Sequence, residues 1–210
     1  KGIYVGTDSY STAGFCFDPW VLYGDGVLTN PNIMLAGVIG AGKSTCAKAL
    51  ATRSLAFGCK AYVPGDPKGE WTPVARAVGG QAIELGGGLP TRLNPLDEGP
   101  HSARLGQPEW AVQVTGRRRD LLRALAELSL GRPLASVEAT AVFAALDRAV
   151  TENTVPTLPQ VVAAMFEPTV GVAGSSPRQL AEDGRLAAHA LNRLVAGDLS
   201  GLFDGPSTTR

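Results

Sequence analysis

The sequence lacks the features that mark membrane-spanning, disulfide-stabilised and metal-binding proteins. No apolar run approaches the roughly 20 residues that a helix needs to span a bilayer. The three cysteines, Cys16, Cys46 and Cys59, are widely spaced and form no Cys-x-x-Cys pair, so they favour a reduced cytoplasmic protein over a disulfide framework. The two histidines, His101 and His189, lie far apart and near no cysteine, so the sequence predicts no metal cage.

An excess of charge of either sign is also lacking. The 19 Lys and Arg residues equal the 19 Asp and Glu residues, so the average charge indicates no strong attraction to nucleic acid or to a membrane surface. The basic run Arg117-Arg118-Arg119 lies in a predicted helix, where a solvated face is the commoner interpretation and a DNA contact or an arginine finger is the alternative. A length of 210 residues fits one large domain or a domain with a sizeable insertion.

Residues 37–44, GVIGAGKS, match the phosphate-loop pattern G-x-x-x-x-G-K-[ST] at every fixed position. Glycines in such a loop let several backbone N–H groups point inward, and the helix that follows adds its positive N-terminal end. Lys43 is predicted to reach the β- and γ-phosphates, and the Ser44 hydroxyl to bind Mg²⁺. An apolar run at 32–36 and a helical pattern at 44–57 supply the strand and helix that this loop requires. A glycine-rich structural turn is the alternative.

The first hundred residues predict an α/β fold. Glycine-studded β-type runs up to residue 28 indicate an antiparallel ribbon, and a short helix is expected to begin with Thr72 as its N-cap. Strand-helix-strand-helix-strand order with short links predicts a parallel sheet covered by helices. The expected strands are 2–5, 14–18 and 20–23 in the ribbon, then 32–36, 60–63 and 81–85 in the parallel sheet.

From about residue 98 the pattern becomes helical. Alanine, leucine and arginine dominate, and helices are predicted from 108 to 130 and from Ser136 to 150. Capping boxes at 157–160 and 176–179 are typical of two more helix starts, and a mobile loop is expected at 167–176. One face of the last helix carries apolar residues at helical spacing, namely Leu180, Ala187, Leu191 and Leu194.

Two carboxylates, Asp66 and Glu70, follow the second expected strand of the parallel sheet. A carboxylate at the carboxyl end of a strand beside the phosphate loop can face the γ-phosphate or its Mg²⁺. A solvated turn is the plainer interpretation, because Asp-Pro and Lys-Gly dipeptides favour turns. A Mg²⁺-dependent ATPase also needs a buried apolar strand that ends in Asp, often Asp-Glu. None of the candidates Asp18, Asp147 and Asp204 meets that description, so this second carboxylate motif is missing.

Taken together, these segments resemble the ATPases of type IV secretion and conjugative DNA transfer, which belong with the HerA–FtsK pumping ATPases. The resemblance rests on residues 30–35 (NPNIML), on the phosphate loop, on 66–70 (DPKGE) and on 93–97 (LNPLD), with a weaker match at 201–205 (GLFDG). It covers about the first hundred residues. DPKGE and LNPLD carry the discrimination, because many families share the phosphate loop.

The resemblance implies an α/β, RecA-like core with an all-helical insertion before its later strands. Residues 1–97 are then the first part of this P-loop core, 98–205 the helical module, and 206–210 a truncated link to the rest of the core, where the Asp-Glu strand is expected. The chain is thus expected to be a fragment that is inactive alone. The site residues implied are Gly37, Gly40, Ala41, Gly42, Lys43, Ser44 and Thr45 for ATP and Mg²⁺, with Asp66 and Glu70 lining the catalytic cleft.

We therefore expect an ATP-binding fragment of a motor ATPase that powers conjugative DNA transfer or type IV protein secretion, with Lys43, Asp66 and Glu70 in catalytic roles. The implied partners are ATP, Mg²⁺, further copies in a hexamer, a membrane-embedded secretion or conjugation complex, and DNA. The implied location is cytoplasmic, at the inner face of the cell membrane. A P-loop kinase for nucleosides or other small molecules, and a nucleotide-stabilised interaction module without turnover, are the alternatives.

Overall fold

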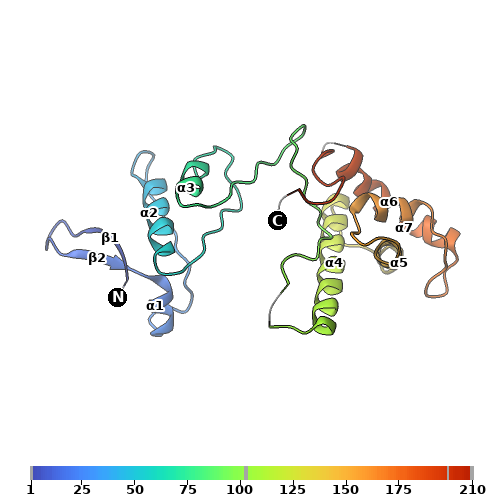
Figure 1. Ribbon diagram of the computed structural model, residues 1–210, viewed down its shortest axis with the longest axis horizontal. Coiled ribbons are helices and arrows are strands. Elements are labelled where there is room, and N and C mark those ends of the chain that lie inside the picture. Colours follow the sequence, from blue (N-terminus) through green and yellow to red (C-terminus); the bar gives the residue numbers. More distant parts are fainter. Residues whose placement is uncertain (1, 102–103, 198, 209–210) are drawn as a thin grey trace. The chain divides into compact units, whose positions relative to one another are not determined.

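The computed structural model describes residues 2–101, 104–197 and 199–208. The chain divides into two compact units, Lys1–Ala82 and Ile83–Arg210, here called unit 1 and unit 2. Unit 1 contains β1 (Ile3–Thr7), β2 (Gly14–Phe17), α1 (Pro19–Gly24), α2 (Lys43–Leu55) and α3 (Thr72–Ala77). Unit 2 contains α4 (Gln107–Leu130), α5 (Ser136–Glu152), α6 (Leu158–Phe166) and α7 (Pro177–Ala196) (Figure 1).

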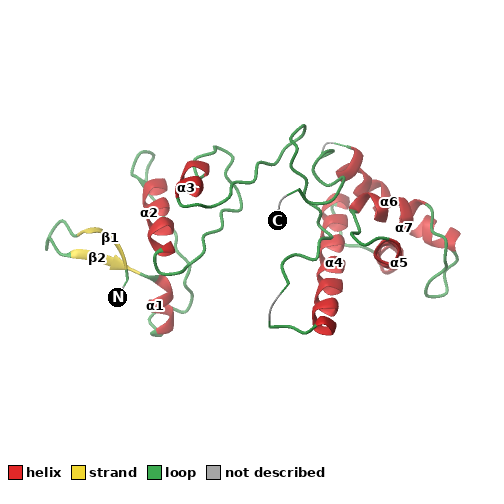
Figure 2. Ribbon diagram, in the orientation of Figure 1, coloured by secondary structure: helices red, strands yellow, loops and turns green. Residues whose placement is uncertain are grey.

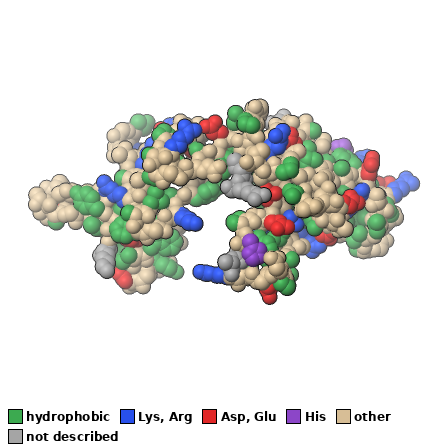
Figure 3. Space-filling model, viewed as in Figure 1, with side chains coloured by type: hydrophobic (Ala, Val, Ile, Leu, Met, Phe, Trp, Pro, Cys, Tyr) green, Lys and Arg blue, Asp and Glu red, His purple; other side chains and the backbone are tan. Residues whose placement is uncertain are grey.

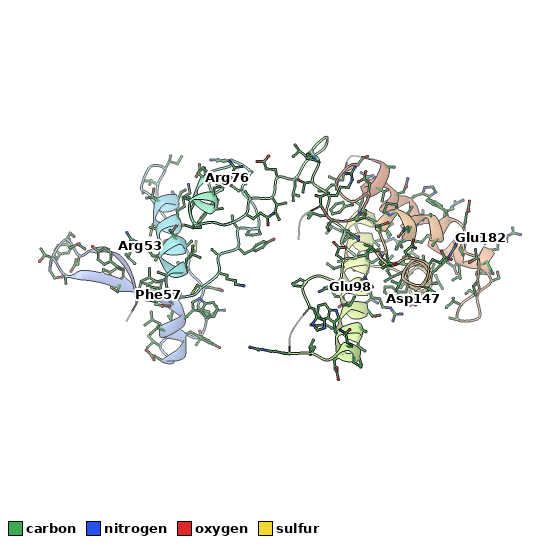
Figure 4. The ribbon with its side chains drawn as sticks, viewed as in Figure 1. Arg53, Phe57, Arg76, Glu98, Asp147 and Glu182 are labelled. Atoms are coloured by element: carbon green, nitrogen blue, oxygen red, sulfur yellow. The ribbon has the colours of Figure 1, made fainter. Side chains whose placement is uncertain are left out.

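Unit 1 begins with an antiparallel ribbon, as predicted. Strand β1 pairs with β2 so that Ile3 lies opposite Phe17 and Thr7 opposite Gly14, with an irregularity between Tyr4 and Gly6. Helix α2 packs against β1, and its Arg53 guanidinium donates hydrogen bonds to the Tyr4 and Val5 carbonyl oxygens. Figure 4 labels this arginine on α2. The ribbon is therefore held to the helix that follows the phosphate loop.

The predicted strand at 20–23 is helical instead, forming α1. The Asp18 carboxylate caps this helix by accepting hydrogen bonds from the amides of Trp20, at 3.0 Å, and Val21, at 3.3 Å. Pro19 occupies the first helical position, where its missing N–H is no loss. An Asp cap followed by Pro is a strong helix start, and here it overrides the β-forming tendency of the aromatic and β-branched residues after it.

The predicted RecA-like parallel sheet is wrong for this structure. Strands are confined to β1 and β2 among the described residues (Figure 2), and the segments 32–36, 60–63 and 81–85 form none. A strand requires a neighbour for its backbone N–H and C=O groups, and a parallel sheet is buried on both faces. Met34 and Tyr62, at the centre of two of these segments, are instead 90% and 88% exposed.

The burial pattern of unit 1 gives the physical reason for this difference. Among its described residues only Ile3 and Pro19 are buried. Figure 3 shows many hydrophobic side chains at the molecular surface. An apolar run of strand length forms a sheet only if long-range pairing covers it, and the local sequence does not encode that pairing.

Unit 2 holds the hydrophobic core. Helix α7 packs against α4, α5 and α6, and α5 packs against α6. The predicted apolar face of the last helix is confirmed, because Leu180, Ala187 and Leu191 are buried and Leu194 packs against the core. The largest fully buried side chains of unit 2 are Leu96, Leu122, Val142, Leu146, Pro156, Leu158, Val161, Met165 and Leu191.

The starts of α6 and α7 and the end of α4 follow the predicted local signals, whereas Ser136, a candidate cap, is the first helical residue of α5 and Ala135 is its N-cap. The Thr157 N–H donates to Gln160 Oε1 at 2.9 Å at the start of α6, and Ser176 Oγ accepts from the Gln179 N–H at 3.3 Å at the start of α7. Helix α4 ends at Gly131, whose φ of 71° is left-handed. Within the part of the chain that the structure describes, no helix is both long and apolar enough to cross a membrane.

Candidate phosphate-binding site

The phosphate loop, residues 37–44, is shaped by two glycines in the left-handed backbone region. Gly40 has a φ of 84° and Gly42 a φ of 82°, and the Ala41 N–H donates to the Val38 carbonyl oxygen at 3.3 Å. A Cβ added at either glycine would meet nothing within 4 Å. Glycine is thus favoured there by backbone conformation rather than by space.

Helix α2 begins within this loop, at Lys43, with an uncapped N-terminus. Its N-cap is Gly42, which has no side chain to accept a hydrogen bond, and the Cys46 N–H donates to the Gly42 carbonyl oxygen at 2.8 Å. The amides of Lys43, Ser44 and Thr45 come before that first helical bond and have no partner within the helix. Donors of this kind, at the positive end of a helix dipole, fit a phosphate group.

The Lys43 side chain folds back over the phosphate loop. Its ammonium donates to the carbonyl oxygens of Gly37 and Val38, each at 2.8 Å. Both bonds are local, and neither places the charge in a buried ion pair. The ammonium therefore stays at the loop, where a phosphate oxygen can compete with two neutral carbonyl groups for it.

Ser44 is the second residue of α2 and is exposed. No group of three or more His, Cys, Asp or Glu side chains able to hold a metal is found among the described residues. Mg²⁺ in phosphate sites is held mostly by water and substrate oxygens, with one or two protein ligands. A single hydroxyl beside the uncapped amides fits that requirement.

Asp66 shapes the turn that precedes α3. Its Oδ1 accepts from the Glu70 N–H at 2.9 Å, and its Oδ2 accepts from the amides of Trp71, at 2.8 Å, and Thr72, at 3.3 Å. The N-cap residue of α3 is Trp71, and Thr72 is its first helical residue. The prediction of Thr72 as N-cap is therefore wrong. The Asp66 carboxylate, six residues before Thr72, accepts the amides at the start of this helix instead. These three bonds give Asp66 a structural role, and its part in a catalytic cleft stays a prediction.

Glu70 contacts α2 through Lys48. The Lys48 ammonium lies 3.5 Å from Glu70 Oε2 and 5.9 Å from the centre of the Trp71 ring. The structure therefore brings the turn at 66–72 against the helix of the phosphate loop. The described hydrogen bonds and ion pairs include none that joins Asp66 or Glu70 to residues 37–44 directly. Sequence reasoning missed Lys48, although its spacing of four residues from Ser44 places the two on one face of a helix.

The arginines at 117–119 all take part in contacts within unit 2. Arg118 is buried, and this burial lowers the pKa of its guanidinium, an effect that the nearby Glu98 carboxylate opposes. Figure 4 labels Glu98, and Asp147 on α5. The three arginines donate hydrogen bonds as follows: Arg117 to the Asp97 carbonyl oxygen, Arg118 to the Leu96 carbonyl oxygen and Arg119 to the Asp147 carboxylate. These contacts favour a structural role over a DNA contact.

The LNPLD segment and the later GLFDG segment meet in unit 2, forming what we call the clasp (residues 92–97 and 202–208). The Leu93 N–H donates to the Leu202 carbonyl oxygen at 2.8 Å, and the Thr208 N–H donates to the Arg92 carbonyl oxygen at 3.0 Å. Arg92 Nε also lies 2.7 Å from Asp204 Oδ1. The two segments of the clasp thus lie side by side within unit 2 (Figure 1). Of the predicted link at 206–210, residues 209 and 210 lie outside the described residues.

Asn94 is the central side chain of the clasp and is buried. Its Nδ2 donates to the Pro156 carbonyl oxygen at 2.8 Å and to Asp97 Oδ1 at 3.0 Å. Its Oδ1 accepts from the Leu96 N–H at 3.1 Å. The Asn94 side chain, which lies within the LNPLD segment, therefore has all of these hydrogen bonds inside unit 2.

The three candidate aspartates for a second carboxylate motif have structural partners. Asp18 caps α1, Asp147 lies within α5 and pairs with Arg119 at 2.9 Å, and Asp204 pairs with Arg92 in the clasp. The interpretation of the Asp147 segment as helix is confirmed.

Comparison with known proteins adds no family to this picture. No family model matches the chain, and neither a curated protein nor a solved structure is significantly similar to it. The resemblance to secretion and conjugation ATPases therefore stays a prediction.

Proposed function

We propose that the chain binds ATP through the phosphate loop and the first turn of α2. The observation that carries this proposal is the pair of left-handed glycines, Gly40 and Gly42, directly before an uncapped helix N-terminus. Left-handed residues before a helix N-terminus allow consecutive amides to face one anion. This geometry occurs in the segment that matches the phosphate-loop pattern, which makes a plain structural turn the weaker interpretation.

The first residues of α2 and Glu70 each have a defined task in this proposal. The amides of Lys43, Ser44 and Thr45 donate to phosphate oxygens, and the Lys43 ammonium leaves its two carbonyl partners to neutralise phosphate charge. Mg²⁺, when bound beside Ser44, supplies charge neutralisation between phosphates. Glu70 acts through water in this proposal: its carboxylate accepts hydrogen bonds from the water shell of the bound Mg²⁺ and from water beside the terminal phosphate.

We propose that this site belongs to a motor ATPase that powers conjugative DNA transfer or type IV secretion. The support is the sequence resemblance at 66–70 and 93–97, and the proposal includes cytoplasmic location, a homo-oligomer and a membrane-embedded complex as partner. The structural support for it comes from the phosphate site. The LNPLD segment gives no structural support, because its Asn94 side chain is already bonded within the clasp.

Binding of a fluorescent ATP analogue in the presence of Mg²⁺ tests the proposal directly. Lys43→Ala should weaken binding by about 10–100-fold, because hydrogen bonds to charged groups contribute about 1.5–3 kcal/mol. Lys60→Ala, which removes an exposed lysine of the same unit, is the matched control and should bind as the unchanged protein does. Absence of binding, or equal binding by Lys43→Ala, would refute the phosphate site. Phosphate transfer to an added nucleoside would select the kinase alternative, and binding without turnover the interaction module.

A further inference from the structure

We propose that Lys48 is a positioning residue that holds the Glu70 carboxylate on the face of α2 that carries Ser44. The inference rests on the proposed function, because it concerns the same phosphate site. Lys48 follows Ser44 by four residues, so both side chains lie on one face of the helix about one turn apart. Side chains of a helix lean toward its N-terminus, so the Lys48 stem is directed toward the loop end of α2.

Two neighbouring residues of the turn contact the same ammonium group. Glu70 Oε2 lies 3.5 Å from Lys48 Nζ, and the Trp71 ring centre lies 5.9 Å from it. The ring limits where the ammonium can move, since a cation over an aromatic face is attracted to it. The Lys48 side chain is only 24% exposed, against 47% for Glu70. Lys48 is thus the more buried member of the pair, and the Glu70 side chain is the one that reaches into solvent beside it.

The turn is cross-linked by its own hydrogen bonds, so that the contacts of Glu70 and Trp71 with Lys48 also place the rest of the turn on α2. The Asp66 carboxylate accepts three backbone amides from residues 70–72, and Gly69, at a φ of 67°, donates its N–H to the Asp66 carbonyl oxygen at 3.0 Å. Asp66 therefore fixes the shape of the turn, and Lys48 fixes its place on the helix.

The exposure of the pair separates a positioning role from a stabilising one. A salt bridge with one half-exposed partner contributes about 0–1 kcal/mol to stability, so losing it should leave the fold almost unchanged. A carboxylate that hydrogen-bonds the water shell of a bound Mg²⁺ has a larger effect, because loss of such outer partners weakens metal affinity about 10–100-fold. The two roles therefore predict different readouts.

Titration of Mg²⁺ into the full chain with a fluorescent ATP analogue tests the assignment. We expect Lys48→Met and Glu70→Gln each to raise the Mg²⁺ concentration for half-maximal binding about tenfold, with no further rise in the double variant. Lys48→Arg should behave like the unchanged protein because it keeps the charge. Lys60→Met is the matched control, and circular dichroism of each variant checks that its helices are intact.

A charge swap makes the test decisive. In Lys48→Glu with Glu70→Lys the ion pair is restored but the carboxylate is moved from the turn to the helix. The positioning role predicts that the swap stays about tenfold weaker in Mg²⁺, whereas full recovery would show that the pair only stabilises the turn and would overturn the inference. Unchanged Mg²⁺ dependence in Lys48→Met would overturn it as well. Failure of the unchanged protein to bind the analogue, or equal binding by Lys43→Ala, identifies failure of the proposed function itself.

Discussion

Replacing Asn94 by alanine should destabilise unit 2 by about 3 kcal/mol. The change removes the donor to the Pro156 carbonyl oxygen and the acceptor of the Leu96 N–H, and both partner residues are buried. A buried polar group left without a partner costs about 1–3 kcal/mol, so two such groups place the sum near the stated value. Asp97 is only half-buried, so water can replace its lost bond at little cost.

Urea unfolding of the full chain, followed by circular dichroism at a helical wavelength, measures this loss, because α4 to α7 are the longest run of helices in the chain. Asn192→Ala on α7 is the control, since that side chain is half-exposed and surface changes usually stay within about 0.5 kcal/mol. Ser207→Ala removes only the hydroxyl that accepts the Asn94 N–H at 2.8 Å, and should lose about 1 kcal/mol. Equal stability of Asn94→Ala and Asn192→Ala would show that the clasp does not hold unit 2 together.

Two further predictions concern unit 2. The Arg132 guanidinium hydrogen-bonds the Glu138 carboxylate and holds its pKa at about 2, below the ordinary 4.5; the stability this gives is present above pH 4.5 and lost as pH falls toward 2. Because Arg132 is 43% exposed, we expect the free energy of unfolding to fall by about 1–2 kcal/mol over this pH range. Glu138→Gln should lack this part of the pH dependence, and an equal fall in that variant would contradict the role of the Arg132–Glu138 pair. An added Cβ at Gly184 would lie 2.9 Å from Ala141 Cβ, while one at Gly116 meets nothing. Thermal unfolding should show Gly184→Ala destabilised by about 1 kcal/mol through overpacking and Gly116→Ala stabilised by about 0.5–1 kcal/mol through helix propensity; a stabilised Gly184→Ala would refute the close approach.

The helices of unit 2 could be predicted from the sequence because their signals are local. A start such as Ser176 with Gln179, or an end such as Gly131, involves residues within one turn of each other. The apolar spacing of α7 likewise reports a single face. Each of these features is present in a short window of sequence, and the packed structure keeps it.

The parallel sheet could not be judged from the sequence for the opposite reason. The segments 32–36 and 60–63 have the composition of strands, yet a strand exists only where another strand lies beside it. The structure provides no such neighbour within unit 1 among the described residues. In α1, by contrast, one capping residue, Asp18, was enough to decide the helix. Local capping chemistry thus outweighs β propensity where pairing is absent.

The candidate site shows the same division between local and long-range information. The fixed positions of the phosphate loop are readable from sequence, as is the turn that Asp66 forms with residues 70–72. The partners of Glu70 and Arg118 are not readable in this way, because each lies 22 residues away in the chain. Asp66 was considered for a catalytic cleft and Arg118 for a DNA contact or an arginine finger. In the structure both side chains hydrogen-bond backbone groups. Lys48 carried no motif at all, yet it joins the turn to the helix.

The shape of residues 37–44 depends on two left-handed glycines and one helix end, and both lie within a dozen residues of sequence. Gly40, Gly42 and the start of α2 therefore keep this geometry although the described residues form no parallel sheet beside them. A ligand held by backbone amides depends on that local geometry first, while a carboxylate acting on the ligand depends on a second segment being held in place. In unit 1 that second requirement falls on one contact between Lys48 and Glu70. Binding of nucleotide and its chemistry thus rest on different parts of the sequence, and substitutions at Lys43 and at Lys48 separate them.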